Sequence, residues 1–180
     1  MAESDAQLVS KVLGGDTSAY GELVRRHQGR VVATARHLIG DRDAAEDVAQ
    51  ETFIEAYRGL RGLRDASRFG HWVYGIVRYR CRKHLDRSGA APLSLDSDSI
   101  PEPAADAPPE GEIDLLARLD HLPYGAKEIL TARYLHDMSY ADIAQMLGTT
   151  VGNVRVRCLR AREALRSALS AASAQEVSQR

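Results

Sequence analysis

The sequence has 180 residues, of which 44% are hydrophobic, and its formal net charge at pH 7 is -1. That length allows one or two small domains, and a charge so close to zero argues against a protein that binds duplex DNA unaided, because such domains usually carry a clear basic excess. The sequence has no apolar run long enough to span a membrane and no signal-peptide pattern in residues 1–16, so we expect a cytoplasmic protein without a membrane partner.

The N-terminal half of the chain predicts an all-α domain. Asp16 is placed to cap a first long helix, and Gly40 is placed to close it. Asp41 then begins a second helix, in which residues at helical spacing mark a buried face: Ala45, Val48, Ala49, Thr52, Phe53, Ala56 and Leu60.

The other face of this second helix is acidic and has almost no counter-charge. A solvated face normally mixes both signs, so we expect this face to dock on a basic surface of a partner. Its residues are Asp43, Glu46, Asp47, Gln50, Glu51 and Ile54.

A third helix is predicted from about Ser67 to Arg87. Its expected buried residues are Phe69, Trp72, Val73, Ile76, Val77 and Leu85. Aromatic and cationic residues alternate around them, which suits an opened DNA strand, because bases stack on rings while phosphates meet Arg and Lys. The pattern leaves open whether Trp72 belongs to the core or to such a stacking surface, and we expect Tyr74 and Tyr79 to be exposed.

Residues 89–111 are rich in Pro, Ala, Ser and Asp, and the run from 89 to 114 contains no Lys or Arg. Such a stretch cannot bury a core, so it predicts a flexible acidic linker between a domain of residues 1–88 and a second domain of residues 112–169. The Ala/Ser/Gln-rich tail after Ser167, including residues 170–180, is expected to fray.

The second domain predicts a helix-turn-helix in residues 139–165. Ser139 and Asp142 have the spacing of a capping box, and Gly148 can adopt the left-handed conformation that ends a helix. A second helix follows, with apolar residues at Val151, Val154, Cys158, Ala161 and Leu165 and with arginines largely on its other faces. An ordinary solvated amphipathic helix is the alternative, and it is less favoured because capping box, turn glycine and single-sign charge all agree.

Catalysis and metal binding have no candidate residues. Cys81 and Cys158 lie in different predicted domains and are expected to be reduced thiols, and the histidines lack ligand spacing. We therefore expect no metal site, no cofactor and no enzymatic activity.

Four motifs in order resemble a bacterial extracytoplasmic-function (ECF) sigma factor of the sigma-70 family. They are DRDAAEDVAQETF (41–53), SRFGHWVYGIV (67–77), LDHLP (119–123) and the Arg-rich helix-turn-helix. The resemblance covers residues 16–169 and implies two helical domains of the sigma region 2 and region 4 types. It further implies that the acidic helix of residues 41–57 docks on the clamp helices of the largest subunit of core RNA polymerase.

The same resemblance implies contacts with promoter DNA, both single-stranded and double-stranded. Residues 61–87 would bind the opened -10 element, and the 61–70 loop occupies the place where the family captures a flipped-out base. The implied -10 residues are Arg61, Arg64, Arg68, Trp72, Tyr74, Arg78, Tyr79, Arg80, Arg82 and Lys83.

The helix-turn-helix would bind the polymerase flap and read the -35 element. The residues expected nearest the DNA are Thr150, Asn153, Arg155, Val156, Arg157 and Arg160. We expect Arg155 or Arg157 to read guanine, since Arg makes two hydrogen bonds to its O6/N7 edge. The resemblance also implies an anti-sigma partner.

The predicted function is therefore an RNA polymerase sigma factor that directs core polymerase to promoters and assists their opening, under the control of an anti-sigma factor. A stand-alone helix-turn-helix regulator with a helical sensing or dimerisation domain is the first alternative. A helical enzyme that uses His27, His37 or His71 is the second.

Overall fold

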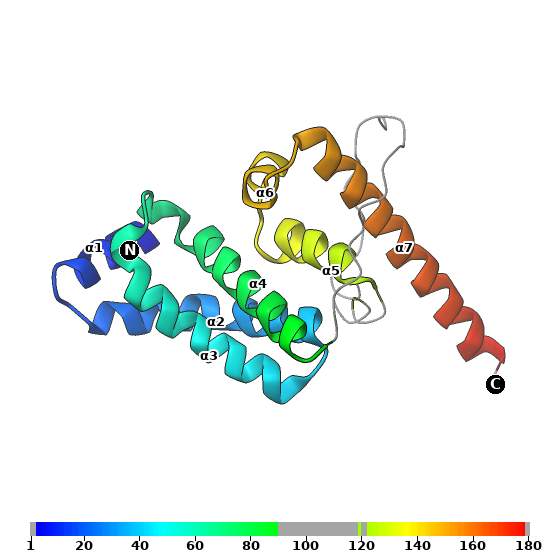
Figure 1. The fold of residues 1–180 in the computed structure, drawn as a ribbon, viewed down its shortest axis with the longest axis horizontal. Helices are drawn as coiled ribbons and strands as arrows, with labels where there is room; N and C mark the ends of the chain where they lie inside the picture. The colour runs from blue at the N-terminus through cyan, green and yellow to red at the C-terminus, as the bar shows by residue number, and fades with distance from the viewer. Residues whose placement is uncertain (1–2, 90–118, 120–121, 179–180) are drawn as a thin grey trace. The chain divides into compact units, whose positions relative to one another are not determined.

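The computed structural model describes residues 3–89, 119 and 122–178, with side chains as far as residue 167. Every regular element in these residues is helical, which confirms the all-α class (Figure 1). The chain divides into two compact units, residues 1–91 and 92–180. Apart from Gly89, the predicted acidic linker lies outside the described residues.

The first unit contains α1 (Asp5–Leu13), α2 (Ser18–Ile39), α3 (Arg42–Gly59), the short 3-10 turns η1 (Leu60–Gly62) and η2 (Ala66–Arg68), and α4 (Phe69–Arg87). The long helices α2, α3 and α4 pack against one another (Figure 1). Their shared core is apolar and includes Leu23, Val31, Phe53, Val73 and Val77. This bundle holds the acidic helix α3 and the basic helix α4 side by side.

The predicted end of α2 at Gly40 and start of α3 at Asp41 are confirmed, whereas the residue that precedes α2 is Thr17 rather than Asp16, and its side chain makes no capping hydrogen bond. The carboxylate of Asp16 accepts a hydrogen bond from the backbone of Ser18 at 3.0 Å. Gly40 ends α2 in the left-handed conformation, with φ of 82°, and the carboxylate of Asp41 caps α3 by accepting from the amide of Ala44 at 2.8 Å. Short polar side chains and a glycine thus determine where the helices start and stop.

Helix α1 was not anticipated, although its start carries a recognisable signal. The Ser4 hydroxyl accepts from the amide of Gln7, whose side chain accepts from the amide of Ser4, and this is a capping box. Leu8 and Val9 follow and are each 2% exposed. The sequence pattern Ser-x-x-Gln before an apolar pair therefore marks a helix here.

The expected exposure of Tyr74 is wrong. Tyr74 is 0% exposed, because it lies three and seven residues before Val77 and Cys81 on the buried face of α4. Tyr79 lies on the other side of the helix and is 56% exposed, as predicted.

The second unit contains α5 (Tyr124–Leu130), the π-helical turn η4 (Thr131–Leu135), α6 (Tyr140–Leu147) and α7 (Val151–Ser178). The predicted helix-turn-helix is confirmed. The Ser139 hydroxyl accepts from the amide of Asp142 at 3.1 Å, the Asp142 carboxylate accepts from the amide of Ser139 at 3.2 Å, and Gly148 has φ of 65°.

One expectation for α7 is wrong. Val151 is 38% exposed rather than buried, because it occupies the first turn beside the loop. α7 extends past Ser167 and ends at Ser178. Residues 168–178 contain no Gly or Pro and are rich in Ala, which is the strongest helix former.

Candidate protein and nucleic-acid interfaces

The acidic face of α3 is solvent-exposed, as predicted. Asp43, Asp47, Gln50 and Glu51 are exposed, and the apolar side chain of Ile54 is 51% exposed beside them. The inward face of the same helix is buried in the bundle core. α3 therefore presents carboxylates and an isoleucine together to a partner.

The expected lack of counter-charge on this face is wrong for two of its residues. Glu46 is half-buried, and its Oε1 lies 2.8 Å from a terminal nitrogen of Arg36 and 3.3 Å from Nε of Arg42. Hydrogen bonds from Arg36 and then Arg42 hold the pKa of Glu46 below its usual range. Glu51 is paired with Arg80 of α4 at 2.7 Å. Arg36 and Arg80 come from other helices, so tertiary packing supplies charges that the local sequence does not show.

The side chain of Arg80 on α4 reaches two carboxylates of α3. Its Nε donates to Glu55 at 2.5 Å while a terminal nitrogen donates to Glu51, and its side chain is 27% exposed. A groove of about 320 Å³ lies beside this contact and is lined by Asp47 and Glu51 from one helix and by Arg80 and Lys83 from the other. Acidic and basic surfaces therefore meet along the line between α3 and α4.

An apolar groove borders the acidic face on its α2 side. It has a volume of about 470 Å³, and its lining includes Val24 and Val32 from α2 and Phe53 and Ile54 from α3. Gln50 lies in the same wall. The α3 surface thus combines exposed carboxylates with a hydrophobic groove, which matches the apolar centre and polar rim of a protein interface.

The basic surface of the first unit lies on α4 and the 61–70 loop. Arg61, Arg64, Arg82 and Lys83 are exposed, and Arg68 and Arg78 are half-buried. Arg82 and Lys83 lie three and four residues after Tyr79 on α4, so this side of the helix combines a ring with cations, as expected for binding a single strand. The buried Tyr74 does not belong to this surface.

Trp72 has a packing role. Its ring centroid lies 6.0 Å from that of Phe69, and a Cβ atom added at Gly59 would lie 3.4 Å from the indole ring. Trp72 is nevertheless only half-buried. One part of the ring therefore packs on the protein while another part faces solvent. Trp72 can thus belong both to the core and to a surface on which a base stacks.

In the helix-turn-helix, the N-terminal end of α7 is the exposed part. Thr150, Asn153 and Arg155 are exposed, whereas Val156 and Arg160 are half-buried. The Thr150 hydroxyl also accepts a hydrogen bond from the amide of Asn153 at 3.2 Å. Thr150 therefore caps the helix, a role that the sequence analysis did not assign to it.

Arg155 and Arg157 have different surroundings. A terminal nitrogen of Arg157 lies 3.8 Å from the carboxylate of Glu128 in α5, and the two side chains are only 15% and 6% exposed. The guanidinium of Arg155 lies 5.9 Å from the centre of the Tyr140 ring, and Arg155 as a whole is exposed. Arg155 is thus the more accessible of the two candidate base readers.

Burial raises the pKa of the Cys81 thiol to about 12. Cys81 and Cys158 are both buried, and neither forms a disulfide bond. Among the described residues, no cluster of His, Cys, Asp or Glu is arranged to hold a metal ion. Within the same residues, no helix is both long and apolar enough to cross a membrane.

Comparison with known proteins identifies both units. The family model of Sigma-70 region 2 matches residues 23–90, and that of Sigma-70, region 4 matches residues 112–165. The RNA polymerase sigma-H factor of Pseudomonas aeruginosa is 35% identical over 93% of this chain and 94% of its own length. The ECF RNA polymerase sigma-E factor of Haemophilus influenzae is 34% identical over 91% of this chain and 95% of its own length.

A solved structure shows the same fold. CnrH, determined in complex with the cytosolic domain of CnrY, is 26% identical and has a TM-score of 0.67, with 94% of this chain and 99% of that chain covered. An all-helical pair of units with a region 2 bundle and a region 4 helix-turn-helix defines a sigma factor of RNA polymerase. The chain belongs to the ECF sigma factors of the sigma-70 family.

Membership of this family favours the sigma-factor prediction over the alternatives that the sequence left open. The relatives are sigma factors rather than enzymes, and they align along nearly the whole chain, so a stand-alone regulator with an unrelated N-terminal domain is excluded. His27, a candidate catalytic residue in the enzyme alternative, is bound to Asp5 at 2.6 Å.

Proposed function

We propose that the α3 surface is where this sigma factor docks on the clamp helices of the largest polymerase subunit. The observation that carries the proposal is the exposure of Asp43, Asp47 and Ile54 on one helix face beside the apolar groove. Carboxylates steer a basic partner, while burial of the groove and of Ile54 supplies the non-directional part of the affinity.

The basic surface of α4 and the 61–70 loop would bind the opened -10 element. Arg61, Arg64, Arg82 and Lys83 would meet phosphates, and Tyr79 would stack on a base. We assign Arg68, Arg78 and the exposed part of Trp72 to the edge of this surface. Arg80 would contribute to this DNA-binding surface only when its partners Glu51 and Glu55 are bound to another protein.

The exposed end of α7 would read the -35 element in the major groove, and the second unit would also contact the polymerase flap. Arg155 is our candidate for reading guanine, because this residue is exposed. Thr150, Asn153, Val156 and Arg160 would position the helix on the duplex. Arg157 would act mainly through its contact with Glu128, which holds α7 against α5.

Conditional DNA binding follows from this division of surfaces. Each DNA-binding surface is small, and acidic residues offset the basic ones, so the free chain binds promoters weakly. When polymerase fixes both units at the separation of the two promoter elements, the second DNA contact becomes effectively intramolecular and avidity rises.

We also propose a cytoplasmic location and control by an anti-sigma factor. CnrH shares this fold and was determined with a protein partner, the cytosolic domain of CnrY. The α3 surface offers such a partner the same acidic and apolar features that it offers polymerase. An inhibitor that covers this surface would compete directly with docking.

The docking proposal is tested by the affinity of the labelled chain for purified bacterial core RNA polymerase. The variant carries Asp43→Lys and Asp47→Lys. The matched control carries Asp86→Lys and Glu163→Lys, which change the net charge equally at exposed sites outside α3. We expect the first variant to lose at least about tenfold in affinity, or 1.4 kcal/mol, and the control to stay within about twofold. Equal losses in both variants would mean that net charge, rather than the α3 face, controls docking.

A further inference from the structure

Helix α1 precedes the residues matched by the region 2 family model, which begins at residue 23. It packs on α2 and also on η1 and η2, the turns that frame the 61–70 loop (Figure 1). Leu8 and Val9 of α1 are almost completely buried. α1 therefore backs the loop that presents Arg61 and Arg64.

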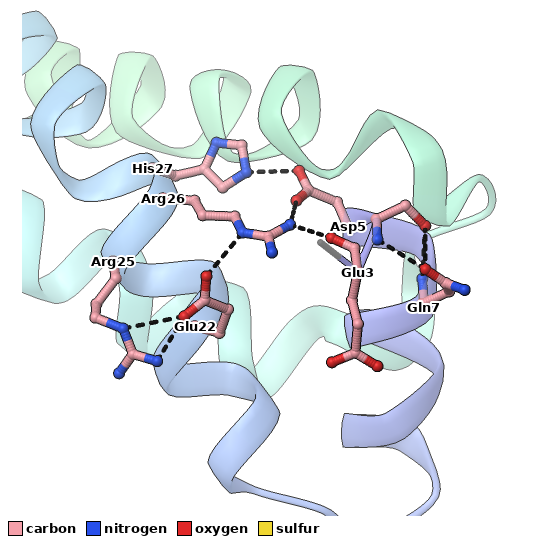
Figure 2. A network of polar contacts seen from close by, with 8 residues as sticks. Glu3, Asp5, Gln7, Glu22, Arg25, Arg26 and His27 are labelled. Carbon is pink, nitrogen blue, oxygen red and sulfur yellow. Dashed lines mark hydrogen bonds and ion pairs between the residues drawn. The ribbon is translucent and has the colours of Figure 1, made fainter. Parts of the chain in front are cut away.

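The first turn of α1 is tied to α2 by charged side chains (Figure 2). Oδ2 of Asp5 lies 2.6 Å from Nε2 of His27, and Oδ1 lies 3.2 Å from a nitrogen of Arg26. Arg26 also donates to the backbone carbonyl of Glu3 at 2.6 Å and to the carboxylate of Glu22 at 2.9 Å. The side chains of Asp5 and His27 are only 23% and 13% exposed, so solvent screens their contact less than it screens an open surface pair.

The ring of His27 also meets the start of α4. Its centroid lies 5.2 Å from that of Phe69 in an edge-to-face arrangement. A Cβ atom added at Gly70 would lie 3.0 Å from Cε1 of His27, so this approach needs glycine unless the ring shifts. One imidazole therefore links the first turn of α1 to the end of the 61–70 loop.

We propose that Asp5 and His27 are positioning residues for promoter opening. They hold α1 against the 61–70 loop and thereby fix the geometry in which the loop meets an unpaired base. Neither side chain touches DNA. The inference rests on the proposed role of this loop at the -10 element, and its physical basis is preorganisation, because an ordered loop loses less entropy when it binds.

The test compares holoenzymes that contain the full-length chain with one of two single substitutions. Asp5→Asn weakens the contact with His27, and His27→Phe keeps a ring against Phe69 but removes the nitrogen that meets Asp5. Three affinities are measured: for a single-stranded -10 oligonucleotide, for a -35 duplex, and for core polymerase. We expect each variant to bind the -10 strand about three- to tenfold more weakly, with the other two affinities within about twofold.

Two further variants make the result decisive. The combined Asp5→Asn and His27→Phe variant is expected to lose no more than the worse single variant, because the two residues act as one contact. The Arg61→Ala and Arg64→Ala double variant tests the loop itself. If the arginine variant loses -10 binding and the Asp5 and His27 variants do not, the positioning role is overturned while the loop role stands.

Two other outcomes also overturn the inference. If the arginine variant leaves -10 binding unchanged, the proposed role of the loop fails, and the positioning role fails with it. If the Asp5 and His27 variants lose all three affinities together and melt at a lower temperature, the pair only stabilises the fold.

Discussion

Nε of Arg80 in α4 donates a hydrogen bond of 2.5 Å to Oε2 of Glu55 in α3. The same guanidinium reaches Glu51 at 2.7 Å. The two helices carry the surfaces that we assign to DNA and to polymerase. In the free protein, a cation expected to bind DNA is therefore occupied by carboxylates of the docking helix.

Neutralising these carboxylates should release Arg80. We expect the Glu51→Gln and Glu55→Gln double variant, without polymerase, to bind a single-stranded -10 oligonucleotide about two- to fivefold more tightly, since exposed ion pairs are each worth up to about 1 kcal/mol. Fluorescence anisotropy at low salt measures this gain. The matched control, Asp43→Asn and Asp47→Asn, removes equal charge from the same helix, and an equal gain there would attribute the effect to net charge alone.

Two tyrosines of α4 should separate stability from DNA binding. Tyr74→Ala should lower the free energy of unfolding by about 3 to 5 kcal/mol, because Tyr74 is fully buried. Tyr79→Ala should change that free energy by less than about 0.5 kcal/mol and weaken single-strand binding by about 1 to 3 kcal/mol. Denaturant unfolding and strand binding of both variants check this, and the reverse assignment would refute the placement of these rings.

Two arginines of α7 should also separate DNA binding from stability. Arg155→Ala should reduce the base preference in a -35 duplex by about 1 to 3 kcal/mol. The N7 atom of guanine is one of the two acceptors for Arg, so replacing guanine by 7-deazaguanine should have no further effect on this variant. Arg157→Ala should instead lower stability by about 1 to 3 kcal/mol, since it removes the guanidinium beside the buried Glu128. Retained base preference in the Arg155 variant would contradict this assignment.

The turn of the helix-turn-helix should depend on local backbone chemistry. Ser139→Ala removes the cap of α6 and should cost about 0.5 to 2 kcal/mol of unfolding free energy. Gly148→Ala should cost about 1 to 2 kcal/mol, because residue 148 has a positive φ, although a Cβ there meets open space. Thermal melting measures both losses, and an unchanged melting temperature in either variant would show that the cap or the turn is dispensable.

Local signals explain why much of the fold was predictable. Gly40, Asp41, Ser139 and Gly148 begin or end helices through contacts within a few residues, and the sequence displays these directly. The acidic face of α3 was predictable for the same reason, since helical spacing alone separates it from the core.

The remaining features depend on residues that are distant along the chain. The partners of Arg80 lie 25 and 29 residues before it, and Arg157 meets Glu128 across two helices. Tyr74 was misplaced because cations and aromatics share the basic segment, and only packing shows which ring faces the core. The capping box at Ser4 is, by contrast, a local signal that the sequence displays as Ser-x-x-Gln before an apolar pair.

The most direct test of the central claim is transcription from a defined promoter with purified bacterial core RNA polymerase. The reactions contain no added chain, the wild-type chain, the Asp43→Lys and Asp47→Lys variant, or the Asp86→Lys and Glu163→Lys control. The account predicts a discrete start site that requires the chain, is lost with the α3 variant and is retained with the control. Full initiation by the α3 variant, or tight specific DNA binding without polymerase and no effect on initiation, would contradict it.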